Sequence, residues 1–266
     1  MKTALALLTR RLDDVALNHE SVISWGSPIP SFGDVSRAKL ATLGLNPSNR
    51  EFVDAVGTEL DGSLRRFHTL TSLGLHRWSD ARPSHFASIY ESCRRYFQNN
   101  PYDAWFKRLD YIASGTSASY YDSVGSACHL DLIPYATARK WTDVAQKQRS
   151  SLLLAVGDTL GLLLRDSPVK LLLLNGRTVV ENFERIAGIR LDKELMPAWT
   201  LPRRAQPGVV GVAYTGSVDR IAGVKLRRDL VVLGYNHNIQ SSFGVTKQVM
   251  TSIRHWVASS MRGAVA

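Results

Sequence analysis

Four short apolar runs, far apart in the chain, most constrain how this sequence can fold. They span residues 39–45, 127–133, 169–174 and 229–233, and each is followed directly by Gly, Asn or Pro. Apolar strands that alternate with helices pack as a parallel or mostly parallel sheet with helices on both faces. We therefore expect an α/β fold with a central, mostly parallel four-stranded sheet flanked by helices, and residues 209–214 are a candidate further strand near its edge.

Helical patterns separate these runs. Apolar side chains recur at three- and four-residue spacing in several segments, and we expect helices at 3–24, 62–75, 84–114 (two helices), 143–165, 178–186 and 246–259. A chain of 266 residues suits one large domain. We predict a single domain over residues 1–266, with an N-terminal helix in residues 1–24 and a helical insertion at residues 76–126.

The charge of the chain favours a polyanionic partner. Lys and Arg number 33 against 23 Asp and Glu, which gives a formal charge of +10 and a pI near 9.8. Such an excess suits phosphate contacts and counterion release, as in DNA binding.

Cysteine content and hydropathy exclude several classes. Cys93 and Cys128 are too few for an iron–sulfur cluster or a four-cysteine zinc site, and we expect reduced thiols in a cytoplasmic protein. No apolar run approaches the roughly 20 residues of a membrane span. Arg10 and Arg11 interrupt the apolar N-terminal run too early for a signal peptide. We expect no cofactor, no metal and no membrane partner.

One strand end stands out as a place for chemistry. The run KLATLGLNPSNREF, residues 39–52, contains Asn46-Pro47, and Pro47 cannot extend a strand because it lacks an N–H. Asn46 is therefore held at the carboxyl end of its strand, the edge at which open α/β sheets bind ligands.

This segment resembles the first motif of the uracil-DNA glycosylase superfamily, close to its mismatch-specific and single-strand-selective branches, except that Ser48 replaces the last Gly. The resemblance extends, in order, to LRRF (64–67), HLDLIPYAT (129–137), LLLLNG (171–176) and GYNHNIQSSFGVT (234–246). It implies that Asn46 positions the attacking water and that Asn238 stabilises the departing base. With a one-residue slip of the second motif, His237 would take the latter role.

The resemblance also implies how DNA is held. Gln240, Ser241 and Ser242 would form the loop that enters the duplex, with Gln240 or Phe243 filling the gap left by the base. Ser48 is a further expected DNA contact. The extracted base would stack on Phe52 or Phe67.

The pair His129 and Asp131 departs from the uracil-specific pattern. In a strand both point to the same face, and Asp131 falls near the position where uracil-specific relatives place Asn. An ionised Asp only accepts hydrogen bonds, so it suits the exocyclic amine of a cytosine better than uracil. Half a metal site is the alternative, but no third ligand is apparent from the sequence pattern.

The resemblance, together with the charge, implies a monofunctional DNA glycosylase. We expect it to act as a monomer on double-stranded DNA, to remove a hydroxymethylated or glucosylated cytosine of bacteriophage DNA, and so to serve antiviral defence. One alternative is a repair glycosylase for uracil or thymine mispairs. The other is a non-catalytic nucleic-acid-binding module that keeps the fold and the charge.

Overall fold

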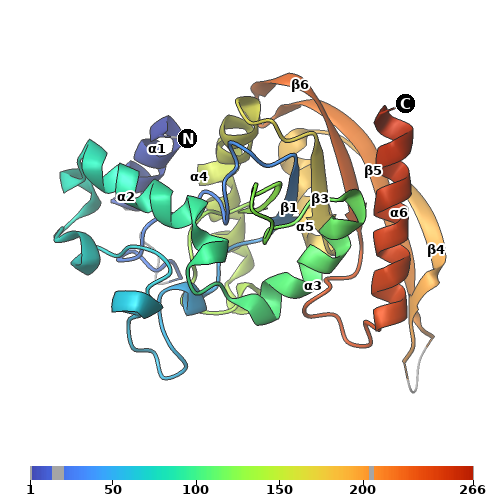
Figure 1. Cartoon of the computed structure of the whole chain (residues 1–266), viewed down its shortest axis with the longest axis horizontal. Helices are drawn as coiled ribbons and strands as arrows, with labels where there is room; N and C mark the ends of the chain where they lie inside the picture. Colours follow the sequence, from blue (N-terminus) through green and yellow to red (C-terminus); the bar gives the residue numbers. More distant parts are fainter. Residues whose placement is uncertain (1, 14–20, 204–206, 266) are drawn as a thin grey trace.

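The computed structural model describes residues 2–13, 21–203 and 207–265, and a six-stranded mixed sheet runs through its centre (Figure 1). The strands lie in the order β2 (Ala127–Asp131), β1 (Leu40–Gly44), β3 (Leu171–Asn175), β6 (Val224–Tyr235), β5 (Val209–Ile221) and β4 (Asp192–Leu201). The first four pair in parallel, whereas β5 and β4 continue the sheet antiparallel to their neighbours.

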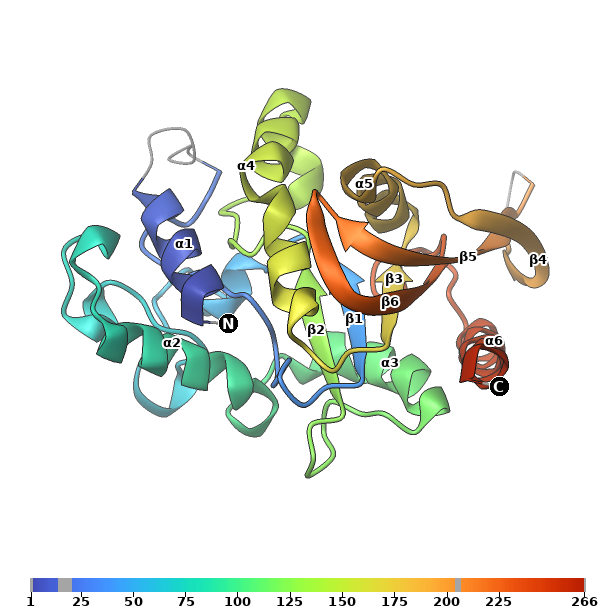
Figure 2. The ribbon, with the colours of Figure 1, turned by 90° about the horizontal axis from the view of Figure 1, so that it is seen from above.

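Helices cover both faces of the sheet. Figure 2 shows α4 (Gln146–Arg165) and α5 (Arg177–Ala187) on one face, with α3 (Asp103–Ala113) and α6 (Lys247–Val265) on the other. Strand β3 is buried on both sides, because Leu172 and Leu174 pack in one core cluster while Leu171 and Leu173 pack in the other. Helices α1 (Lys2–Leu12) and α2 (Pro83–Arg94) pack together at one end of the sheet. Among the residues described, no helix has both the length and the apolar character needed to cross a membrane.

The α/β class and the four parallel strands are confirmed, but the sheet is larger than predicted. Strand β5 continues past the predicted 209–214 to Ile221, and β4 was not predicted at all. The first seven residues of β4 are not buried, so the strand lacks an apolar pattern. Together with β6 these two strands form an antiparallel extension of the parallel sheet.

One predicted helix is shorter than expected, and another is wrong. The N-terminal helix ends at Leu12, and Val22 instead forms a bridge with Thr137; part of the predicted span, residues 14–20, lies outside the described residues. The segment 62–75 contains only the short 3-10 helices Gly62–Leu64 and Thr71–Leu73. Both Gly62 and Gly74 have positive φ, 53° and 64°, which breaks a right-handed helix at each end.

The two outer edges of the sheet differ. At β2, Phe32 exchanges two backbone hydrogen bonds of 2.9 Å with His129, so a loop covers that edge. At β4, exposed Lys193 and Glu194 precede Pro197, and the pairing with β5 is irregular between Met196 and Leu201.

Candidate active site

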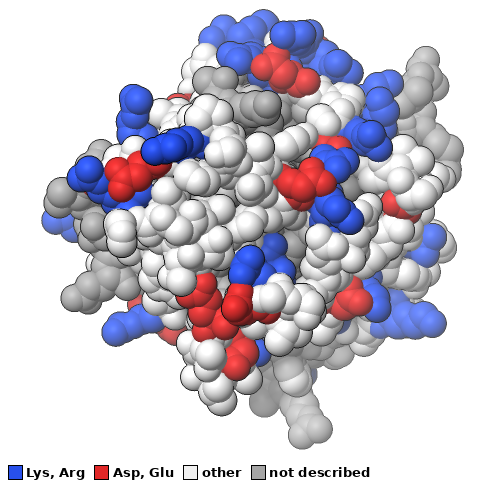
Figure 3. Space-filling model, turned by 60° about the vertical axis from the view of Figure 1, so that its left-hand side comes forward, with Lys and Arg blue, Asp and Glu red and all other residues white. Residues whose placement is uncertain are grey.

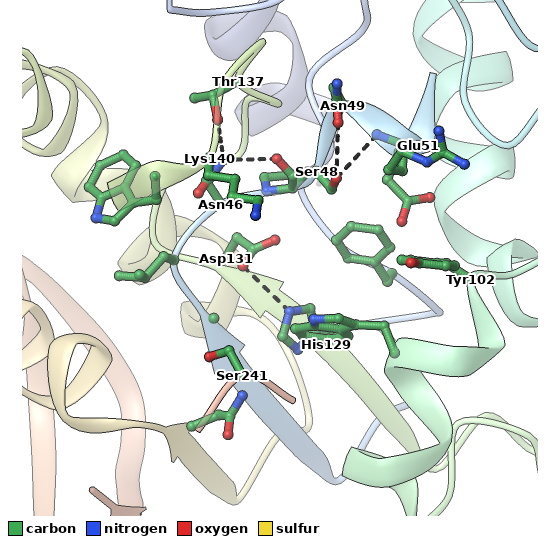
Figure 4. Close-up of a pocket in the computed structure, with 18 of the residues that line it drawn as sticks. Asn46, Ser48, Asn49, Glu51, Tyr102, His129, Asp131, Thr137, Lys140 and Ser241 are labelled. Carbon is green, nitrogen blue, oxygen red and sulfur yellow. Dashed lines mark hydrogen bonds and ion pairs between the residues drawn. The ribbon is translucent and has the colours of Figure 1, made fainter. Parts of the chain in front are cut away.

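A cavity of about 420 Å³ lies where the parallel strands end. The carboxyl ends of β1, β2, β3 and β6 are adjacent in the sheet, so the residues that follow them meet in space. Polar residues of this cavity include Asn175 and Asn238, together with six that Figure 4 labels: Asn46, Glu51, His129, Asp131, Thr137 and Ser241. Its aromatic lining consists of Phe32, Tyr102, Trp105, Phe106 and Trp141.

The amide of Asn46 has a fixed orientation. Its Nδ2 donates to Pro47 O at 2.8 Å and to Thr137 Oγ1 at 2.9 Å. The single proton of the Thr137 hydroxyl goes to Arg139 O at 2.7 Å, so Thr137 must accept from Asn46. The Asn46 Oδ1 atom has no hydrogen-bond partner among the described residues and is left to accept from a water in the cavity.

The amide of Asn238 is fixed in the opposite sense. Its Oδ1 accepts the backbone N–H groups of Gln240 and Ser241, each at 3.0 Å, which leaves Nδ2 as the free donor. Asn238 packs closely against the backbone of Gly176, where a Cβ would lie 3.1 Å from the Asn238 Cβ. Asn46 and Asn238 both line the cavity, and among the described residues the oxygen of the first amide and the nitrogen of the second have no hydrogen-bond partner.

His237 does not line the cavity. It is buried, and its Nε2 lies 2.7 Å from Trp199 O on strand β4. Burial lowers its pKa, and the hydrogen bond to Trp199 opposes this. Thus Asn238 lines the cavity, whereas the neighbouring His237 is hydrogen-bonded to strand β4.

Two buried hydrogen bonds orient His129 beside Asp131. Tyr120 OH lies 2.5 Å from Thr42 Oγ1, which lies 2.7 Å from His129 Nδ1, and His129 Nε2 lies 3.4 Å from Asp131 Oδ1. The Tyr120 proton has an acceptor only if Tyr120 donates to Thr42 and Thr42 donates to Nδ1 of His129. The proton of a neutral His129 is then on Nε2 and faces the Asp131 carboxylate. A Cβ at Gly44 would clash with Asp131 Oδ1 and lie 3.0 Å from His129 Nε2, so a larger residue there would displace this pair.

Glu51 is a cavity residue that the sequence analysis missed. It ends the 3-10 helix Asn49–Glu51 and is buried, and both of its carboxyl oxygens lie near the Tyr96 hydroxyl, at 3.0 and 2.9 Å. Burial raises the pKa of Glu51 to about 7, against the opposing effects of the Tyr96 hydrogen bond and the Arg66 charge. The sequence carries no signal for this burial, because a Glu directly after Asn49 and Arg50 is typical of a solvated turn.

The expected stacking ring is not in the cavity. Phe52 is buried behind it, with its ring against Trp25 and over Gly26, where a Cβ would lie 2.9 Å from Phe52 Cε1. Phe67 packs in the same aromatic core. The five aromatic residues named above line the cavity instead.

Of the four expected DNA contacts, Ser48 and Ser241 line the cavity and are exposed, whereas Gln240 and Ser242 do not line it. Gln240 is held inward, because its Oε1 accepts from Asn175 Nδ2 at 2.8 Å and its Nε2 donates to Trp105 O at 3.3 Å. Phe243, in the same loop, is 85% exposed.

Basic residues accompany the cavity. Arg50, Arg139 and Lys140 contribute to its lining. On the face shown in Figure 3, Lys and Arg side chains gather along the upper rim and elsewhere lie among acidic ones. On this face the positive charge forms separate groups, with no single continuous stripe among the residues drawn in colour or white.

Among residues 2–13, 21–203 and 207–265, no three His, Cys, Asp or Glu side chains come together as a metal site would require. His129 and Asp131 stand as a pair in the cavity wall. Comparison of the chain with models of known protein families and with curated proteins finds no match in either case.

Proposed function

We propose that the protein is a monofunctional DNA glycosylase. In this reaction a water oxygen bonds to the anomeric carbon of the deoxyribose while the bond to the base breaks. The base leaves with the bonding electron pair and takes up a proton, and an abasic site remains. The site must therefore orient a water and stabilise negative charge on the leaving base.

The orientation of the Asn46 amide is the observation that carries this proposal. Thr137 and Pro47 hold its Nδ2, so its Oδ1 is the atom that can accept a proton of the attacking water. Asn238 presents the complementary group, an amide N–H able to donate to the departing base. These are the two roles that the resemblance to uracil-DNA glycosylases assigns to Asn46 and Asn238.

A modified cytosine is the substrate that the site favours. Asp131 offers an acceptor oxygen, Oδ2, that no described residue satisfies, and it suits an exocyclic amine. The cavity of about 420 Å³ lies in the size range of sites that take drug-sized ligands, which are larger than a single pyrimidine ring. A hydroxymethyl group or a sugar on the ring would use that room, as in the modified cytosines of bacteriophage DNA. Antiviral defence is the role that such a substrate implies.

The loop after Asn238 supports base extraction from a duplex. Gln240 is tied inward, so Phe243 is the residue able to occupy the space left by the base. Arg50, Arg139 and Lys140 are placed to contact phosphates beside the cavity. We propose that the chain acts as a monomer on double-stranded DNA in the cytoplasm, without a cofactor.

Two rival functions make different demands on the site. A repair enzyme for uracil or thymine mispairs needs a donor toward the base carbonyl at the position that Asp131 occupies, and an ionised Asp131 cannot supply one there. A non-catalytic DNA-binding module places no demand on Asn46, whereas here the Asn46 side chain lines the cavity and is held by two hydrogen bonds.

The test is base release from defined duplexes. The pure protein is incubated with DNA that carries uracil, a thymine mispair, hydroxymethyluracil, hydroxymethylcytosine or glucosylated hydroxymethylcytosine, and the free base and the alkali-labile sites are measured. We expect release of a modified cytosine by the wild type and none by Asn46→Ala. Release of uracil or thymine alone would support the repair function, and DNA binding without release from any duplex would support the non-catalytic module.

A further inference from the structure

Glu51 and Asp131 place two buried carboxyl groups in the wall of one cavity. They come from different parts of the chain, since Glu51 follows strand β1 and Asp131 ends strand β2. Figure 4 shows both carboxyls around the same space, together with Asn46. Two such groups can act as one recognition unit if their protonation states differ.

Glu51 has fewer hydrogen bonds than a buried carboxylate needs. The Tyr96 hydroxyl is its single hydrogen-bond partner among the described residues. Arg66 Nε lies 4.0 Å away, and this guanidinium already donates to Asn100 O at 2.8 Å and to Arg50 O at 2.6 Å. An ionised carboxylate has about four acceptor positions, and leaving most of them empty in a buried site is costly.

The neutral acid fits this environment better. Burial raises the pKa of Glu51 to about 7, and the charge of Asp131 adds to the rise, while Tyr96 and Arg66 lower it. Near neutral pH a large share of the molecules then has a proton on Glu51. In that form Glu51 carries a hydrogen-bond donor in the wall of the cavity.

We propose that Glu51 reads the base together with Asp131: neutral Glu51 donates to a ring nitrogen of the base, while ionised Asp131 accepts from the neighbouring exocyclic amine. This inference rests on the proposed function and deepens it. Cytosine-type bases have such an acceptor beside an amine, whereas the ring N–H and carbonyl of uracil present the reverse order. The hydrogen bond to the ring nitrogen would also give the Glu51 proton an acceptor.

The groups that face Glu51 set the pH dependence. They are Tyr96 on the 3-10 helix Tyr96–Gln98, Arg66, and Asp131 on β2, with His129 behind Asp131. Because the neutral form of Glu51 binds, affinity for the base is full well below pH 7 and falls as the pH rises through the pKa of Glu51. With a pKa of about 7 the loss between pH 6.5 and pH 8 is about eightfold.

The test is calorimetric binding of the free base 5-hydroxymethylcytosine to the full chain between pH 6 and pH 8.5. For the wild type we expect affinity to fall about eightfold between pH 6.5 and pH 8. We also expect uptake of about 0.9 proton on binding at pH 8, determined by comparing the binding enthalpies in buffers of different ionisation enthalpy. Glu51→Gln mimics the neutral acid, so its affinity should stay within a few-fold of the wild type at pH 6.5, stay level with pH and show no proton uptake.

Asp110→Asn is the matched control. Burial raises the pKa of Asp110 as well, but this residue bonds Ser119 and Tyr120 and does not line the cavity. Asp110→Asn should leave the pH dependence of the affinity for 5-hydroxymethylcytosine unchanged. If Glu51→Gln does not fold, Tyr96→Phe serves instead, because loss of its hydrogen bond should move the midpoint to higher pH.

The inference is overturned if the base does not bind the wild type, if Glu51→Gln keeps the wild-type pH dependence, or if Tyr96→Phe leaves the midpoint unchanged. These results are separate from failure of the proposed function. Binding with the expected proton uptake, but no base release from any duplex, would reject the glycosylase and retain the recognition pair. Base release together with a pH-independent affinity would retain the glycosylase and reject the recognition pair.

Discussion

Replacing Asp131 by Asn tests whether this residue selects the base. In the wild type His129 Nε2 lies 3.4 Å from Asp131 Oδ1, and Thr42 and Tyr120 hold the proton of a neutral His129 on that nitrogen. In Asp131→Asn the new amide would keep its oxygen in this position, because two N–H donors facing each other repel. The amide nitrogen would then replace Oδ2, the atom that has no partner among the described residues. The substitution therefore exchanges an acceptor for a donor while the shape of the side chain hardly changes.

A well-made base contact contributes about 1–3 kcal/mol of discrimination. At about 1.36 kcal/mol for each factor of ten, we expect release of the modified cytosine to slow about 5- to 150-fold, and a weak gain of activity on uracil. The assay is single-turnover base release from matched duplexes that differ only in the target base. Urea denaturation provides the control, since the free energy of unfolding should change by less than about 1.5 kcal/mol.

The decisive quantity is the ratio of the rates on the cytosine derivative and on uracil. A folded Asp131→Asn protein that retains the wild-type rate on the cytosine derivative would remove this residue from the specificity mechanism. It would also weaken the case for a cytosine-type substrate. A uniform loss on all substrates would point to a role in holding the cavity together.

Four further predictions concern the same site and the loop beside it. Asn46→Ala should abolish base release while DNA affinity, measured by titration, stays within a few-fold, because the change removes water positioning and leaves phosphate contacts; equal losses of binding and turnover would contradict this. Asn238→Ala should lower the single-turnover rate of base release about 100-fold. His237→Ala should affect mainly stability, because His237 is hydrogen-bonded to Trp199 O. A large loss of rate in His237→Ala and none in Asn238→Ala would shift the second motif by one residue. Phe243→Ala should slow release from duplex DNA more than from single strands and leave the melting temperature unchanged, because the ring is 85% exposed; equal rates on both substrates would exclude a wedge role. DNA affinity should fall steeply with salt, since the chain has a formal charge of +10, and a flat response in a binding titration would mean that these charges are only a solvated surface.

The sequence predicted the parallel strands because each has a strong local signal. Runs such as LLLLN are buried on both faces, and Asn or Pro ends them sharply. Since parallel strands end at one edge of the sheet, Asn46, Asp131 and Asn238 could be placed together without knowledge of the tertiary contacts. Strand β4 gave no such signal, because a half-exposed edge strand has mixed composition.

Side-chain directions in loops could not be predicted from the sequence. His237 and Asn238 are adjacent, yet one is fixed to a strand backbone and the other lines the cavity. Gln240 is held by Asn175 and Trp105, which are distant in sequence. Glu51 likewise depends on Tyr96, 45 residues further along the chain, so its burial is a property of the folded packing alone.

The different edges of the sheet have a consequence for self-association. Exposed backbone groups along an edge strand can pair with a strand of another molecule and start aggregation. At β2 the backbone N–H and C=O of His129 are already hydrogen-bonded to Phe32 of the covering loop. At β4, charged Lys193 and Glu194, the missing N–H of Pro197 and the irregular pairing after Met196 make a poor template for a further strand. The long antiparallel extension can therefore widen the sheet without offering neighbouring molecules a regular strand to join.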